Sequence, residues 1–304
     1  MPGITRAQFQ RLFFPGLREI IYKSYKRKEP QYVKIFNQMT SSSAFEEDYM
    51  MTGVGLLQRT DEETEVPSDK FFPGLSIRYD HLDYTLQVGF SHQFIRDGKT
   101  TIWNDRSSDL GFSANQTEEV LHADVFNNGF GSYIIYDGQP FFSPSHPLIR
   151  GGGPTGQLQS NVLASPSTLS VTSYRDMLTL GRLLFDETGV RRIQIDLMNL
   201  VVPPQLEFVA EEITKSITRP DTANRADNIT KGRTAVIVWD YLLNPKFWYM
   251  GCDKGRHKVK SYMREKFATR TYMDDRTRTN WIACAEAFSF GVSDYKGWFG
   301  TNPT

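Results

Sequence analysis

Apolar residues recur at helical spacing in three parts of the chain. The clearest stripe places residues at i, i+3, i+4, i+7 and i+11, and it consists of Leu206, Val209, Ala210, Ile213 and Ile217. This period of 3.6 predicts an amphipathic helix, and Pro204 stands where a proline suits a helix start. Residues 104–131 and 167–184 repeat the period less regularly, and there too we expect helices. Within residues 104–131 the second half shows the clearer period, and it carries Glu118 and Glu119 near its start. Ser113 or Asn115 is its expected N-cap.

Apolar residues alternate with polar or small ones between residues 58 and 99. The alternating positions are Ile77, Tyr79, Tyr84, Leu86, Val88 and Phe90. A period of two predicts strands, and we expect the two runs to pair as a hairpin around a long turn. Because such a hairpin has little apolar content of its own, it would need a partner surface to lie on.

Shorter apolar runs predict further strands. They occupy residues 132–136, 192–202, 234–239, 247–250 and 281–292. The first is expected to close in a turn at Asp137-Gly138, whereas residues 140–156 are rich in Pro and Gly and predict irregular structure. Residues 1–50 predict an arm whose helix is interrupted at Pro15. From about residue 154 to 275 the pattern favours a compact α/β unit.

Composition narrows the class of protein. Of 304 residues, 39% are hydrophobic and 23% charged, which predicts a folded chain of one large or two small domains. Its 35 basic and 35 acidic residues cancel, which argues against a protein that grips nucleic acid through its phosphates. Aromatic residues reach 13%, which favours a subunit that buries surface against neighbours. Apolar runs are too short for a bilayer and the N-terminus lacks a signal peptide, so we expect cytoplasmic synthesis and no membrane partner.

Residues with candidate chemistry are sparse. Cys252 and Cys284 have no metal-ligand spacing, none of the five histidines pairs with another at such spacing, and no nucleotide or cofactor motif occurs. We therefore expect no metal and no cofactor. A basic cluster, Lys23, Lys26, Arg27 and Lys28, is either a solvated face or a surface turned toward a partner.

One hydrolase alternative rests on His146. A catalytic pair would use this histidine as the base and either Ser143 or Ser145 as the nucleophile. However, such a serine is normally presented by a strand-turn-helix elbow, and here it would lie beside its base in a Pro-flanked loop. A structural histidine is favoured, and we expect no enzyme activity.

The order of the expected elements resembles the Hong-Kong-97-type capsid fold, and several segments resemble the Mu-like major head subunit family of tailed bacteriophages. These segments are residues 25–35, 41–43, 47–53, 137–148 (DGQPFFSPSHPL), Asn161, 200–207 (LVVPPQLE) with Ala210, 247–250 (FWYM), 290–291 (FG) and 294–297 (DYKG). Two departures stand out. The charged segment after Arg59 lacks the family's usual turn, and Tyr295-Lys296 replaces its Trp-Arg pair.

The resemblance implies an α+β fold made of an N-arm, an E-loop β-hairpin, a P-domain with a long spine helix, and an α/β A-domain. Mapped onto this chain, the arm would be residues 1–57, the E-loop 58–99, the P-domain 100–153 with a closing strand in 279–304, and the A-domain 154–278. A separate scaffolding protein is expected.

It further implies a major capsid protein that assembles into hexamers and pentamers of an icosahedral shell around double-stranded DNA. Partners would be portal and scaffolding proteins, a decoration protein in some capsids, and DNA at the inner face, with Lys23, Lys26, Arg27 and Lys28 facing it. The implied inter-subunit residues are Lys70, Phe71, Phe72, Arg78, Tyr84 and Lys99. No local feature marks Lys70 or Lys99 for a covalent cross-link. A second alternative is a minor head decoration or adaptor protein.

Overall fold

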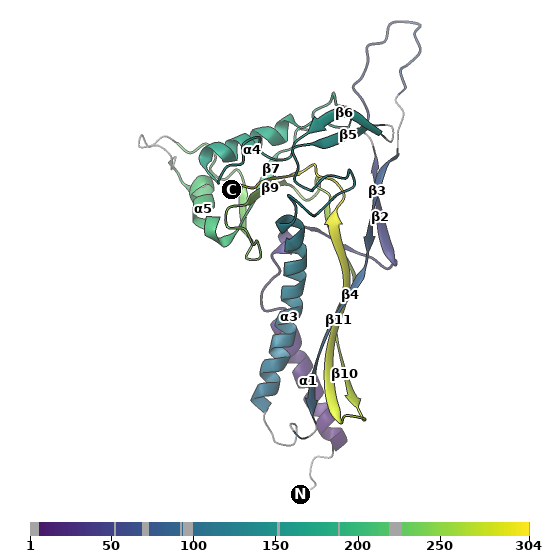
Figure 1. The fold of residues 1–304 in the computed structure, drawn as a ribbon, viewed down its shortest axis with the longest axis vertical. Coiled ribbons are helices and arrows are strands. Elements are labelled where there is room, and N and C mark those ends of the chain that lie inside the picture. Colours follow the sequence, from purple (N-terminus) through teal and green to yellow (C-terminus); the bar gives the residue numbers. More distant parts are fainter. Residues whose placement is uncertain are drawn as a thin grey trace.

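The chain forms a long stem that carries a wider upper body, as Figure 1 shows. The computed structural model describes residues 6–51, 53–68, 73–91, 93, 100–150, 153–187, 189–218 and 227–303. The N-terminal end of the chain lies at the foot of the stem, and the C-terminal end lies in the upper body. A hairpin runs along one side and ends in a loop that projects past the upper body.

The stem is one β-sheet with two helices packed on the same face. The sheet has the order β1-β10-β11-β4, in which β1 is parallel to β10 and the other pairs are antiparallel. Its elements are α1 (Arg6–Tyr25), α3 (Thr100–Asn127), β1 (Asn37–Thr40), β4 (Leu82–Ser91), β10 (Val259–Asp274) and β11 (Thr279–Val292). Apolar side chains from both layers bury one another there: Leu17, Ile21, Phe90, Trp103, Leu110, Phe267, Ile282 and Cys284.

The upper body surrounds a second sheet of order β12-β9-β7-β8. Its elements are β7 (Leu197–Val202), β8 (Ala235–Val238), β9 (Trp248–Cys252), β12 (Trp298–Thr301), α4 (Val171–Leu183), α5 (Glu207–Lys215), the 3-10 turns η1 (Tyr32–Lys34) and η2 (Pro204–Leu206), and a separate hairpin of β5 (His146–Arg150) and β6 (Gly153–Gln159). Ser170 caps α4 by accepting from the Ser173 backbone N–H. Pro204 begins the turn into α5, as the sequence predicts.

Phe126, in the last turn of α3, joins the stem to the upper body. Its side chain is fully buried. Ring centroids of Phe36, Phe141, Trp239, Tyr249 and Trp298 lie 5.0–6.1 Å from its own, all near edge-on. The long helix is thus fixed at its upper end by aromatic packing drawn from widely separated parts of the chain.

The hairpin expected within residues 58–99 is paired differently. β2 (Phe45–Met51) is antiparallel to β3 (Pro73–Asp80), while β4 pairs with β11. The prediction that residues 77–79 and 84–90 pair with each other is therefore wrong, because β4 finds a longer and more apolar partner in β11 than β3 could offer. The projecting hairpin instead spans residues 45–80.

Several other local predictions also differ from the structure. α1 continues through Pro15, and α3 begins at Thr100 instead of being capped near residue 113. Asn115 donates to the backbone oxygens of Tyr25 and Lys28, so it holds the arm instead of capping a helix. The strand expected at 132–136 is reduced to one bridge, and residues 146–159 form a hairpin where irregular structure was expected.

Strand β10 was missed altogether. Its exposed polar residues hide the period of two. As β10 and β11 pair along most of their length, the expected boundary at residue 278 falls in the turn that joins them.

Replacing Phe126 by alanine tests the junction between stem and upper body. We expect Phe126→Ala to lower the free energy of unfolding by about 3–5 kcal/mol, because the cavity is enclosed by rings that cannot collapse into it. Denaturant titration of the unassembled subunit measures this. Phe208→Ala is the matched control, since Phe208 is 74% exposed, and its effect should stay within about 0.5 kcal/mol. Equal losses of stability in the two variants would refute the role of Phe126 in joining the stem to the upper body.

Candidate assembly surfaces

The base of the β2–β3 hairpin is fastened to the stem by polar contacts that are buried or partly buried. Lys260 Nζ donates to Asp48 at 2.6 Å, and the Tyr79 hydroxyl hydrogen-bonds to Ser293. His81 lies between Ser41 and Ser289, with one ring nitrogen near each hydroxyl. These contacts fix the direction in which the hairpin leaves the body.

Gly291 provides the space that this fastening needs. A Cβ at this position would lie only 2.7 Å from the Tyr79 ring and 2.8 Å from the Tyr133 hydroxyl. Any larger residue would push Tyr79 away from Ser293. The position therefore requires glycine for close approach of the hairpin to β11.

The loop beyond the hairpin, residues 53–68, exposes apolar side chains. The exposed fractions are 48% for Val54, 59% for Leu56, 102% for Leu57 and 79% for Val66. Its acidic residues are Asp61, Glu62, Glu63 and Glu65, and Arg59 is its single basic residue. Exposed leucines and valines clustered on a projection mark a surface that binds something.

The residues predicted for inter-subunit contact are spread over different environments. Arg78 is exposed, forms an ion pair with Asp80, and lies 3.8 Å from the ring centroid of Phe45. Tyr84 is half-buried and stacks on Phe288 at 4.6 Å. The remaining four, Lys70, Phe71, Phe72 and Lys99, lie outside the described residues.

The basic cluster lies where α1 ends. Lys23, Lys26 and Arg27 are exposed, and Lys28 forms an ion pair with Asp240 of the upper body. More basic residues are exposed along β10 and its turn: Arg264, Lys266, Arg270, Arg276 and Arg278. The acidic loop and these exposed basic residues therefore lie on different parts of the chain.

Two buried glutamates of α3 hold the arm in place. Glu118 accepts from the hydroxyls of Tyr25 (2.6 Å) and Tyr32 (2.8 Å). Glu119 accepts from the backbone N–H of Gln31 and from Trp239 Nε1. Burial raises the pKa of Glu119, partly offset by these donors. From the sequence, Glu118 and Glu119 were interpreted only as acidic residues near a helix start. Their position among the apolar residues of that helix is the feature that indicates burial.

His122, one turn further along α3, is neutral. Its Nδ1 donates to the Glu118 carbonyl oxygen at 2.6 Å, which leaves Nε2 to accept from Ser261. Burial lowers the pKa of His122 to about 3. The ring of His122 stacks on that of Tyr32 with centroids 3.9 Å apart, so it provides a flat surface on which the arm packs.

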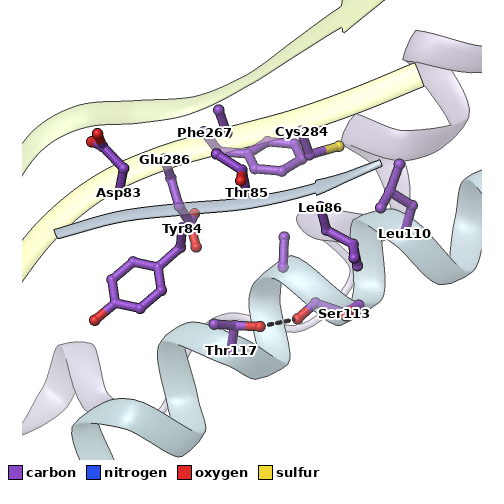
Figure 2. Close-up of a pocket in the computed structure, with 12 residues that line it drawn as sticks. Asp83, Tyr84, Thr85, Leu86, Leu110, Ser113, Thr117, Phe267, Cys284 and Glu286 are labelled. Atoms are coloured by element: carbon purple, nitrogen blue, oxygen red, sulfur yellow. Dashed lines mark hydrogen bonds between the residues drawn. The ribbon is translucent and has the colours of Figure 1, made fainter. Parts of the chain in front are cut away.

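A groove of about 380 Å³ opens between β4 and α3 in the stem, as Figure 2 shows. Apolar side chains from both layers line it, together with polar groups: Asp83, Tyr84, Thr85, Leu86, Leu110, Ser113, Ala114, Thr117, Phe267, Cys284, Ala285 and Glu286. Strand β4 is an edge of the sheet, so the groove lies beside backbone groups with no neighbouring strand.

Glu286 is the unusual residue of this groove. It is 4% exposed, and its carboxyl group faces the carboxyl group of Glu118. Burial, followed by the charge of Glu118 and a hydrogen bond between the two carboxyl groups, raises the pKa of Glu286 to about 9. The groove therefore has apolar walls and a carboxyl group at its inner end.

His146 is enclosed in a structural network. Nδ1 lies 2.7 Å from Asp137, and both side chains are fully buried. Asn161 donates its amide hydrogens to the carbonyl oxygens of Phe141 and Trp298, so its Oδ1 faces Nε2 and that nitrogen must donate. The ring also stacks on Tyr295 at 3.9 Å.

The two serines of the hydrolase alternative bond elsewhere. Ser143 Oγ and Ser145 Oγ contact each other and Gln139. Because Nε2 is already a donor to Asn161, it is not a base for either serine. The geometry does not support this alternative.

The described part of the chain holds no group of three or more potential metal ligands among its His, Cys, Asp and Glu residues. In the same ranges, no helix is long and apolar enough to span a membrane.

Removing His146 should destabilise the fold without any catalytic consequence. His146→Ala leaves the Asp137 carboxylate buried beside an unfilled space, and we expect a loss of about 3–5 kcal/mol in the free energy of unfolding. Ser145→Ala, on the same loop, should cost less than about 1 kcal/mol. Denaturant titration compares the two, and similar small losses would show that the network is not structural.

Glu286 should make subunit stability fall as pH rises through neutrality toward about 9. Its pKa is raised on folding, so its contribution is complete below its ordinary pKa and is lost as pH rises toward about 9. The groups that face it are Glu118 of α3, Tyr25 of α1 and Tyr84 of β4. Glu286→Gln should therefore be increasingly more stable than the native protein from pH 6 to pH 9. Parallel pH profiles of the two melting temperatures would contradict this.

Comparisons with known proteins agree with this architecture. The family model described as phage capsid protein matches residues 75–300. No curated protein sequence matches the chain. The structure is similar to the procapsid subunit of bacteriophage JBD30, with a TM-score of 0.55 and 12% identity over 99% of this chain and 77% of that one. It is also similar to the mature capsid of bacteriophage PhiM1, with a TM-score of 0.59 and 8% identity over 90% and 86%.

A third similar structure comes from Mycobacterium phage Cain, with a TM-score of 0.54 and 9% identity over 100% of this chain and 99% of that one. These likenesses confirm the capsid fold expected from the sequence. The family match covers well over half of the residues. The chain belongs to the phage capsid protein family.

Proposed function

We propose that this chain is the major capsid protein of a tailed bacteriophage, that it forms hexamers and pentamers, and that these close into an icosahedral shell around double-stranded DNA. It acts by association and not by catalysis. Family membership and the capsid fold support the shell role. The closer relation to the Mu-like head subunits stays a prediction from sequence.

The observation that carries the proposal is the exposed loop on a firmly anchored hairpin. A monomer has no use for fully exposed leucine at the end of an acidic projection. The basic surface of α1 and β10 supplies the complementary charge on another copy. Copies would therefore associate by laying the hairpin of one on the stem of the next, with many modest contacts adding through multivalency.

The parts of the chain take the following roles in this proposal. The E-loop corresponds to residues 45–80 in place of 58–99, because those are the residues that pair as the hairpin. The P-domain is the stem, which takes in β10 as well as α3, β4 and β11. The A-domain is the upper body, and the arm is the segment that Glu118 and Glu119 hold.

We further propose a place in the virion shell, after synthesis in the bacterial cytoplasm. Lys23, Lys26 and Arg27 are exposed at the end of α1 and would face packaged DNA. Portal and scaffolding proteins, and a decoration protein where one is present, would be the other partners. The alternative of a minor head protein is less favoured, because the match covers 86% of a chain of the PhiM1 mature capsid.

Shortening the loop separates assembly from folding. Replacing residues 54–67 by a short Gly-Ser connection leaves the β2–β3 pairing and the base contacts in place, so we expect an unchanged melting temperature. Particle formation should fall at least tenfold, measured by size-exclusion chromatography and negative-stain microscopy. The native chain is the reference, expressed with its neighbouring head genes. A native chain that stays a monomer under all conditions would refute the shell role.

A further inference from the structure

The loop of residues 53–68 lies against the upper body of its own copy at its neck. Gly53 and Gly55 are half-buried there, whereas the other residues of the loop are exposed. The neighbouring segment is the turn of residues 185–192, which is described except at residue 188 and lies in the connection from α4 to β7. Val190 of this turn and the loop line one hollow of about 630 Å³. The two segments therefore meet within a single subunit.

Arg191 of the turn lies directly over Gly53. A Cβ at position 53 would come within 2.8 Å of Arg191 Nη2 and 3.5 Å of Asp186 Oδ2. Arg191 Nε in turn pairs with Asp186 Oδ2 at 3.0 Å, and the side chain of Asp186 is buried. The guanidinium is therefore held from behind by a buried carboxylate, and its far end covers backbone that carries no side chain. Glycine leaves room for so close an approach.

Two further contacts fix the turn on the upper body. Gln159 of β6 accepts from the backbone N–H of Phe185 at 3.1 Å and donates to the backbone oxygen of the same residue at 3.0 Å. Lys296 donates to Glu187, and both side chains are largely buried. Lys296 is the lysine that replaces arginine in the closing segment of the family resemblance, and here it holds the turn. The position of Arg191 is thus set by the rigid part of the molecule.

We propose that the turn of residues 185–192 is a clamp that positions the projecting loop before assembly, with Arg191 as the positioning residue. This rests on the proposed shell function, in which the loop is the part that associates. A loop whose neck is already fixed has fewer conformations to lose when it binds, so less free energy is spent on ordering it at that step. The clamp acts through the order and direction of the loop, and it needs no contact with the partner.

A guanidinium suits this position better than an ammonium would. Arg191 uses Nε for the carboxylate of Asp186, which directs Nη2 over Gly53. Lysine has a single nitrogen, which would stay on Asp186 and leave Gly53 uncovered. Arg191→Lys therefore keeps the buried carboxylate paired and removes only the cover over the neck of the loop.

Loosening the clamp should free the loop and leave the fold intact. In Gly53→Val the new side chain displaces the end of the Arg191 side chain, which can turn into solvent because it is 46% exposed. In the unassembled subunit we expect amide hydrogen exchange in residues 53–68 to become faster by about fivefold or more, and trypsin to cleave after Arg59 correspondingly faster. The melting temperature should stay within about 2 °C of the native value. Arg191→Lys should change exchange and cleavage in the same direction.

Gly131→Val is the matched control, because a Cβ at position 131 would meet nothing within 4 Å. Its exchange in residues 53–68 and its cleavage after Arg59 should equal those of the native chain. Arg182→Ala is a second control, since it removes an exposed ion pair with Asp196 elsewhere in the upper body. If Gly53→Val and Arg191→Lys also match the native chain, the clamp does not exist and the proposal is overturned, while the shell function stands.

The rate of assembly tests what the clamp is for. Because a free loop must be ordered at association, Gly53→Val and Arg191→Lys should form particles several-fold more slowly than the native chain. Light scattering of purified subunits, followed by negative-stain microscopy, measures this. A freer loop with an unchanged rate would refute the positioning role. A native chain that never forms particles would refute the shell function and the positioning role with it, whereas exchange and cleavage in the subunit still decide whether the clamp exists.

Discussion

The fold depends on helix α3, which buries unlike side chains along its length. In its last turn Phe126 enters the aromatic core of the upper body. Further down, Glu118 and Glu119 accept hydrogen bonds from the arm, and Leu110 packs in the stem. A single rigid element therefore sets the positions of the arm, the stem sheet and the upper body relative to one another. A shell subunit needs such rigidity, since small angular errors accumulate over a closed surface.

Segregated charge explains how a neutral chain can associate strongly. The acidic loop of residues 53–68 and the exposed basic residues of α1 and β10 lie on different parts of the chain, and each presents charge mainly of one sign to a neighbour. Contacts of this kind are individually weak in water, because exposed ion pairs are worth only about 0–1 kcal/mol. Weak and repeated contacts suit assembly, as wrongly placed subunits can leave again before the shell closes.

Much of the fold could be predicted from the sequence, and the failures have two causes. The stripe from Leu206 to Ile217 and the apolar runs of β7, β8, β9 and β11 carry their periods openly, so these elements were found. Strand β10 was missed, because its exposed side reads as charged loop. Strand partners were wrong for β3 and β4, because pairing depends on which edge is available in three dimensions and not on distance along the chain.

The sequence predicted the candidate site less well than it predicted the fold. Arg78 and Tyr84 were expected at an interface from their place in the resemblance, whereas Glu286 was not considered. Its position in the alternating run of β11 suggests only a polar residue on a strand. What makes it notable is its burial opposite Glu118, which only the packing of β11 on α3 creates.

A carboxyl group kept in such a place is unfavourable to the isolated subunit, since burial and a second acid both oppose its charge. Glu286 therefore lowers the stability of the isolated subunit as pH rises above the ordinary pKa of a glutamate, because the folded state holds its proton and the unfolded state does not.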